Sequence, residues 1–140
     1  MKIAVLGSGL MGSAAVRYLV ARRDVKRVQL ADIDEKKLEQ TAKLVRSRKL
    51  TTLKLDMTDK ASVAKSIKGC DSVLIALPHA VAPRVDRAVI DARVSAVDLA
   101  FEDEQMKMDS LCKRAGITLI PGCGVAPGLA QILAGEGARQ

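Results

Sequence analysis

The sequence of 140 residues predicts an α/β domain built on a doubly wound, parallel, six-stranded sheet with the strand order 3-2-1-4-5-6. Two observations carry this prediction. Short, apolar, β-branched runs alternate along the chain with segments whose apolar residues recur at helical spacing. A glycine-rich stretch, GSGLMG, stands between the first apolar run and the first helical segment. Such alternation requires right-handed crossovers, which place helices on both faces of the sheet.

Each predicted element has a local signal. The run 72–77 is the most uniformly apolar, as expected for a central strand that is covered on both faces, and Pro78 ends it. Asp34 and Asp59 can cap the helices that follow them, and Gly69 ends the second of these helices. We expect strands at 2–6, 27–31, 50–55, 72–77, 95–99 and 117–120, and helices at about 10–22, 34–45, 59–69, 81–92 and 103–115, with a further helix from about Gly128.

The first helix is expected to bury one apolar face. The residues that recur on this face are Leu10, Met11, Ala14, Ala15, Tyr18 and Leu19.

No linker, low-complexity tract or internal repeat interrupts the chain. The sequence therefore predicts a single dinucleotide-binding domain over residues 1–140.

The glycine-rich stretch has the spacing and the position of a phosphate-binding turn. Gly7 permits a tight turn, Gly9 lets the backbone approach a pyrophosphate, and Gly12 allows close packing at the start of the helix. The N–H groups at that helix start then face the phosphates. We expect Gly7, Ser8, Gly9, Leu10, Met11 and Gly12 to contact the cofactor of a Rossmann-type domain; the alternative is a glycine turn that serves only the chain reversal.

The second strand supplies an independent signal at its end. Asp32, followed by Ile33, can accept hydrogen bonds from the adenosine ribose, and its charge would repel a 2′-phosphate, so NAD is favoured over NADP. The alternative role for Asp32 is a turn or capping aspartate beside Asp34. The basic run 46–49 is a weaker alternative as a 2′-phosphate site, because it follows the second helix rather than the second strand.

Two further stretches follow strands at the edge where ligands bind in such sheets. Asp56 and Met57 could contact the adenine ring, and Ala76, Leu77 and Pro78 should border the middle of the cofactor and its nicotinamide side. His79 is a candidate acid or base, with an exposed residue at a helix start as the alternative. The sequence identifies no catalytic residue.

Composition excludes several classes of function. The formal net charge of +7 comes from basic residues interleaved with acids, and one Tyr, one Phe and no Trp leave few rings on which bases could stack, so no nucleic-acid partner is expected. One histidine and three scattered cysteines argue against a metal site or a disulfide framework. We expect no membrane segment and a cytoplasmic location.

Three stretches resemble the saccharopine dehydrogenase-like family, which includes lysine dehydrogenases: MKIAVLGSGLMGSAAVRYL, LADID and GVAPGLAQIL. The resemblance implies an oxidoreductase that moves a hydride between a nicotinamide cofactor and an amine or imine carbon. It also implies that Gly7, Gly9, Gly12 and Asp32 hold the cofactor. The loop 122–128, which contains Cys123, would lie near the nicotinamide and the substrate.

Members of this family continue into a second domain that holds an amino-acid substrate. We expect this chain to lack that domain and to be inactive alone, and exposed apolar surface could lead it to self-associate. The alternative function is a non-catalytic module that senses a nucleotide or binds a partner.

Overall fold

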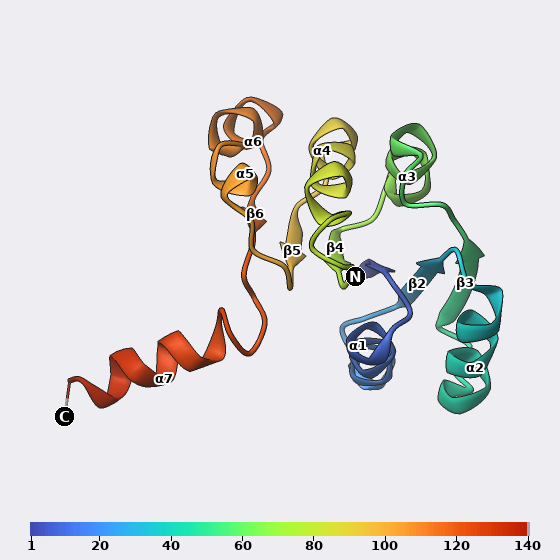
Figure 1. Cartoon of the computed structure of the whole chain (residues 1–140). Coiled ribbons are helices and arrows are strands. Elements are labelled where there is room, and N and C mark those ends of the chain that lie inside the picture. The colour runs from blue at the N-terminus through green and yellow to red at the C-terminus, as the bar shows by residue number, and fades with distance from the viewer. Residues whose placement is uncertain (140) are drawn as a thin grey trace.

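A computed structural model describes residues 1–139, which form a six-stranded parallel sheet in the order β3-β2-β1-β4-β5-β6, as predicted (Figure 1). The strands are β1 (Lys2–Leu6), β2 (Arg27–Asp32), β3 (Leu50–Lys54), β4 (Ser72–Ile75), β5 (Ala96–Asp98) and β6 (Leu119–Ile120). The helices are α1 (Leu10–Ala21), α2 (Glu35–Val45), α3 (Lys60–Ile67), α4 (Ala82–Ala92), α5 (Asp103–Met106), α6 (Asp109–Ala115) and α7 (Leu129–Gly137). The helices α1 and α2 cover one face of the sheet, and α3, α4, α5 and α6 cover the other (Figure 1).

The alternating side chains of the central strand β1 belong to two separate hydrophobic cores, one on each face of the sheet. Ile3 and Val5 pack with residues of α1 and α2, whereas Ala4 and Leu6 pack with residues of α3 and α4. Successive residues of a strand point to opposite faces, so a strand that is apolar throughout is buried on both sides. This explains why the runs that form β1 and β4 contain so few polar residues.

Local capping signals place several helix ends as expected. The side chain of Asp34 accepts hydrogen bonds from the N–H groups of Lys36 and Lys37, and that of Asp59 accepts one from Ser62. Gly69 and Gly116 both have a positive φ directly after a helical segment. These interactions are local in sequence, which is why they could be read from it.

The expected buried face of α1 is wrong for most of its residues, although Ala15 and Leu19 are half-buried and Leu19 packs against the core. Leu10, Met11 and Tyr18 are exposed, and the buried residues of the helix are Gly12 and Val16. The first turn of α1 lies at the edge of the sheet, where Leu10 and Met11 border a crevice. Helical spacing alone could not reveal that an apolar face lines an open site.

The segment 103–115 forms two short helices rather than one. α5 ends at Met106 and α6 begins at Asp109, with the buried side chain of Met108 between them. The strands β5 and β6 are also shorter than expected. α7 extends away from the sheet, and none of its residues Leu129–Gly137 is buried (Figure 1).

Candidate functional site

The loops after β1, β2, β3 and β4 surround one crevice of about 530 Å³ at the carboxyl edge of the sheet. Open α/β sheets bind their ligands at this edge, where the winding direction reverses. The crevice is lined by Gly7, Gly9, Leu10, Met11, Asp32, Ile33, Lys37, Asp56, Met57, Thr58, Ala76, Leu77, Pro78 and Val81. The structure thus brings together residues that lie far apart in the sequence and that were expected to share one site.

The three glycines of the first loop have different surroundings. Gly7 has a φ of +103°, and a Cβ there would lie 2.3 Å from the carbonyl oxygen of Ala76. A Cβ on Gly12 would lie 1.9 Å from the carbonyl oxygen of Gly7. A Cβ on Gly9 would meet no atom within 4 Å. Gly7 and Gly12 are therefore required by the fold, whereas Gly9 keeps the space above the loop open.

Gly9 is also the N-cap of α1, and no side chain caps this helix end. The first N–H groups of a helix have no partner within the helix, and the helix dipole makes this end positive. An anionic group above Gly9 would thus meet N–H donors without a steric obstacle. This arrangement suits a phosphate.

Ser8 and Gly12 do not line the crevice, although both were expected to contact a cofactor. Ser8 is buried, and its N–H and Oγ donate to Oδ2 of Asp32 over 2.6 and 2.8 Å. Gly12 packs against the backbone of Gly7. Both residues therefore stabilise the conformation of the glycine loop rather than line the crevice.

The carboxylate of Asp32 is anchored on the loop and on its own turn. Besides the two hydrogen bonds from Ser8, its Oδ1 accepts one from the N–H of Asp34 over 2.9 Å. Burial acts to raise the pKa of Asp32, but the hydrogen bonds from Asp34 and Ser8, together with the charge of Lys37, hold it below its ordinary value. The carboxylate is therefore ionised, and Oδ1 retains one lone pair for a ligand.

Lys37, Thr58 and Val81 line the crevice without having been expected there. Lys37 belongs to the first turn of α2, and its Nζ lies 3.7 Å from Oδ2 of Asp34. The helix that follows the second strand begins beside Asp32, so a basic residue in its first turn was a detectable signal. Thr58 donates two hydrogen bonds to Oδ1 of Asp56, which orders the turn after β3.

The basic run 46–49 lies at the opposite edge of the sheet. It directly precedes β3, whose first residue pairs with Val28 near the start of β2. Nζ of Lys49 donates to the carbonyl oxygen of Arg22 over 2.7 Å, at the far end of α1 from the glycine loop. This run does not contribute to the crevice.

A smaller cavity of about 180 Å³ shares Met11, Ala76 and Leu77 with the crevice. Its other walls are His79, Leu99 and Ala100. The side chain of His79 is 65% exposed, and its Nδ1 lies 3.0 Å from Oε1 of Glu102. The loop 122–128 adjoins these walls, because the N–H of Gly122 donates to the carbonyl oxygen of Ala100 over 2.8 Å.

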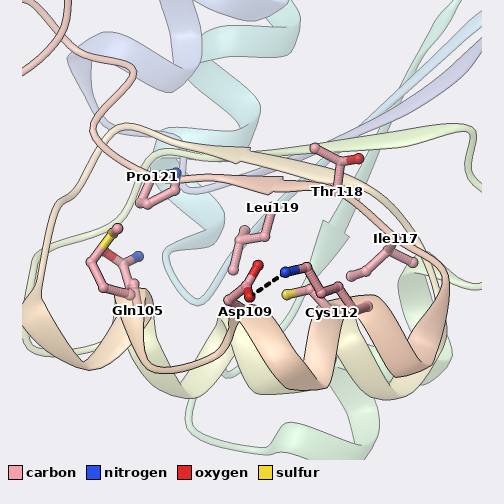
Figure 2. A pocket seen from close by; sticks show the side chains of 9 residues that line it. Gln105, Asp109, Cys112, Ile117, Thr118, Leu119 and Pro121 are labelled. Atoms are coloured by element: carbon pink, nitrogen blue, oxygen red, sulfur yellow. Dashed lines mark ion pairs between the residues drawn. The ribbon is translucent and has the colours of Figure 1, made fainter.

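A separate hollow of about 360 Å³ lies at the β6 edge of the sheet (Figure 2). Figure 2 shows Gln105, Asp109 and Cys112 on the helical side of this hollow, with Leu119 and Pro121 opposite. Asp109 and Lys113 form an ion pair there over 2.8 Å. The hollow is remote from the glycine loop and shares no lining residue with the crevice.

The strand order and the glycine loop at the carboxyl end of β1 define a dinucleotide-binding domain of the Rossmann type. Comparison with known families agrees: the family described as "Saccharopine dehydrogenase NADP binding domain" matches residues 3–120. The chain belongs to this family, and it is an NAD(P)-binding domain of the saccharopine dehydrogenase-like oxidoreductases.

Among curated proteins, the chain is 28% identical over 137 residues to the mitochondrial alpha-aminoadipic semialdehyde synthase of Rattus norvegicus. It is 27% identical over 136 residues to the enzyme of the same name from Bos taurus. Each match covers 96% of this chain but 14% of the relative, so the chain spans about one seventh of the length of these proteins.

Solved structures show the same fold. The apo saccharopine dehydrogenase (L-Glu forming) of Saccharomyces cerevisiae matches with a TM-score of 0.85 and 24% identity over 95% of this chain and 29% of that one. GenD2 from gentamicin A biosynthesis, in complex with NAD, matches with a TM-score of 0.65 and 22% identity over 87% of this chain and 34% of that one. AtPrR2 with NADP⁺ and pinoresinol matches with a TM-score of 0.66 and 16% identity over 86% and 48% of the two chains.

Two further findings concern residues 1–139 alone. No helix among them has the length and apolar character needed to cross a bilayer. No three His, Cys, Asp or Glu residues in this part of the chain are grouped so that they could hold a metal ion.

Proposed function

We propose that the crevice binds a nicotinamide dinucleotide, with NAD preferred over NADP. The observation that carries this proposal is the glycine loop: Gly9 leaves open space at the uncapped start of α1, while Gly7 and Gly12 hold the turn in place. A pyrophosphate fits this cradle because it is anionic and needs close approach to backbone N–H groups. The proposed contact residues are Gly7, Gly9, Leu10, Met11, Asp32, Ile33, Asp56, Met57, Ala76, Leu77 and Pro78, with Ser8 and Gly12 supporting the loop.

The preference for NAD rests on Asp32. Its ionised carboxylate has one lone pair that remains free to accept a hydrogen bond from the ribose, and its charge would repel a 2′-phosphate. Lys37 supports the alternative, because this cation lines the same end of the crevice and could pair with a 2′-phosphate. The family description, which names NADP, makes this alternative worth testing directly.

Calorimetric titration of the chain with NAD and with NADP tests the proposal. We expect tighter binding of NAD, a weaker affinity for NAD in Asp32→Ala, and little change for NAD in Lys37→Met. If NADP binds more tightly and Lys37→Met removes that advantage, Lys37 rather than Asp32 sets the specificity. A folded chain that binds neither dinucleotide would contradict the proposed site.

We further propose that the full enzyme transfers a hydride between the nicotinamide and the amine or imine carbon of an amino acid. The names of the yeast and mammalian relatives support this reaction class. When bound, the nicotinamide supplies or accepts the hydride. The residues of this chain bind and orient the cofactor, and a second domain would hold the substrate.

Turnover assays separate this enzyme role from a purely nucleotide-binding role. We expect residues 1–140 to bind NAD, and we expect oxidation of an amino acid to require the second domain that we propose for the full enzyme.

Cys70, Cys112 and Cys123 are free thiols, which supports a reducing compartment such as the cytoplasm.

A further inference from the structure

Three polar side chains meet in the interior between α4, β5 and α5. Asp86 and Asp98 are 0% exposed, and Gln105 is 3% exposed. Nε2 of Gln105 donates to Oδ2 of Asp86 over 2.6 Å and to Oδ2 of Asp98 over 2.8 Å. One amide group therefore joins two buried carboxyl groups, and we call this set the carboxyl–amide network.

The network leaves one acceptor without a partner. Oδ1 of Asp98 accepts a hydrogen bond from the N–H of Ala100 over 2.8 Å, whereas Oδ1 of Asp86 has no hydrogen-bond partner among residues 1–139. Gln105 is fixed at its other end as well, because its Oε1 accepts from the N–H of Glu102 over 2.7 Å. Two buried carboxylates without a cation partner in the network repel each other, so a proton on the pair relieves the repulsion.

The surroundings favour a neutral Asp86. Burial raises its pKa to about 7; the hydrogen bond from Gln105 opposes that rise, and the charge of Asp98 adds to it. Burial also raises the pKa of Asp98, against hydrogen bonds from Ala100 and Gln105 and the charge of His79. Burial also raises the pKa of the Cys112 thiol on α6, and the charges of Asp109 and Asp86 add to that rise.

The network also holds the segments that wall the smaller cavity. Leu99 and Ala100 line this cavity directly after Asp98. The carbonyl oxygen of Asp98 accepts from the N–H of Cys123 over 2.9 Å, and that of Ala100 accepts from Gly122 over 2.8 Å. The segment 98–102 is thus anchored on the network and in turn positions the start of the loop 122–128.

We propose that Gln105 is a positioning residue and that a proton on Asp86 keeps the cavity wall ordered to receive the nicotinamide end of the cofactor. This inference rests on the proposed function, because it takes the crevice and the adjoining cavity to hold a nicotinamide dinucleotide. When the proton is lost, two negatively charged carboxylates, those of Asp86 and Asp98, accept hydrogen bonds from the same amide group of Gln105 and repel each other. The wall formed by 98–102 and 122–123 then opens more often.

Amide hydrogen exchange tests the network without any ligand. The N–H groups of Gly122 and Cys123 should exchange before those of β1, and their protection should fall by up to about tenfold per pH unit between pH 5 and 7 and then level off. Asp86→Asn should keep the wall closed and remove this pH dependence. Asp91→Asn makes the same change on an exposed residue of α4 that pairs with Lys60, and it should behave like the wild type.

Two exchange results would overturn the proposal. One is the same pH dependence in Asp86→Asn as in the wild type. The other is exchange of Gly122 and Cys123 only together with the β1 amides, because the network would then support the whole fold rather than the wall. Gln105→Met, which removes both donors at similar volume, should expose these two amides at every pH.

Calorimetry with NAD and with ADP-ribose connects the wall to the ligand. ADP-ribose lacks the nicotinamide, so only the affinity for NAD should fall between pH 5.5 and 7.5, and Asp86→Asn should abolish that fall. A pH-independent ratio of the two affinities would contradict the positioning role. If neither ligand binds, the proposed function fails, and the exchange experiment still decides whether the network orders the wall.

Discussion

The side chains of Asp32 and Asp86 lie in two regions of the domain that shift the pKa of an aspartate in opposite directions. Asp32 ends β2 beside the glycine loop and accepts three hydrogen bonds, so its pKa lies below its ordinary value. Asp86 lies inside α4, where burial raises its pKa to about 7, and it accepts a single hydrogen bond that opposes this rise only in part. Asp86 is fully buried whereas Asp32 is only partly buried, so burial and the number of donors around each carboxyl group together decide its charge.

This contrast separates a ligand site from a structural site. An anion with a free lone pair at the crevice can recognise a hydroxyl-bearing ligand. Asp86 lines neither the crevice nor the smaller cavity, so its neutral form acts by holding neighbouring segments in place. The following predictions test the two regions separately.

Gly12→Ala should have the largest effect, because it disturbs the backbone of the glycine loop that lies beside Asp32. The added methyl group would lie 1.9 Å from the carbonyl oxygen of Gly7, which cannot move without distorting the turn. We expect a loss of about 3 kcal/mol or more in the free energy of unfolding. Urea denaturation followed by circular dichroism would measure it, and an unchanged midpoint would contradict the packing described for α1.

Gly9→Val is the matched change in the same loop. Its side chain would enter open space, so the fold should survive with a cost of about 1 kcal/mol for the poorer helix N-cap. Binding of NAD should fall by at least about tenfold because the side chain occupies the place of the pyrophosphate. Calorimetry would measure the loss, and wild-type affinity in the folded variant would exclude the phosphate cradle.

The region of Asp86 should make the protein less stable as the pH rises. The folded pKa of about 7 lies above the ordinary 3.8, so the folded state retains a proton that the unfolded state has lost. The stabilisation is complete below about pH 4 and is lost as the pH rises to about 7, at no more than about 1.4 kcal/mol per pH unit. Urea denaturation at pH 5, 6, 7 and 8 should show this slope in the wild type but not in Asp86→Asn.

The region of Asp32 should act with the opposite sign and at lower pH. Its pKa is below 3.8 in the folded state, so its contribution is present above that value and is lost as the pH falls through the folded pKa. Asp32→Asn should make the acid limb of the stability curve shallower by less than about 1 kcal/mol, because the group is partly exposed. Acid titration of both proteins would reveal the difference, and parallel curves would disprove it.

Arg48→Ala should have the smallest effect. Arg48 is exposed and belongs to the run 46–49, at the edge of the sheet opposite the crevice. Its removal should change neither NAD nor NADP affinity by more than the error of a calorimetric titration. A selective loss of NADP affinity would revive the basic run as a 2′-phosphate site.

The sequence predicted the Asp32 region well because its signals are local. The glycine spacing, the strand ending at Asp32 and the cap at Asp34 each depend on a few neighbouring residues, and the strand order is the one typical of the fold that they indicate. The Asp86 region was not predicted. Asp86, Asp98 and Gln105 are separated by 12 and 7 positions and come from three different elements, so no spacing connects them before the chain folds.

Helical periodicity failed in α1 for a related reason. An apolar stripe indicates that a surface avoids water, but not whether a core or an open crevice covers it, and Leu10 and Met11 lie at the crevice. The position of Lys37 in the first turn after Asp32 was a signal in the sequence, but only the packing of α2 shows that this residue lines the crevice. Both facts depend on how the elements pack.

By itself, the sequence determined the alternation of strands and helices, the parallel sheet and the glycine turn, because these follow from local conformational preference and apolar patterning. The tertiary structure alone decided which acids are charged, which helix face meets the crevice and which segments wall the smaller cavity. Those properties depend on desolvation and on donors that distant residues bring together, and neither exists until the chain is packed.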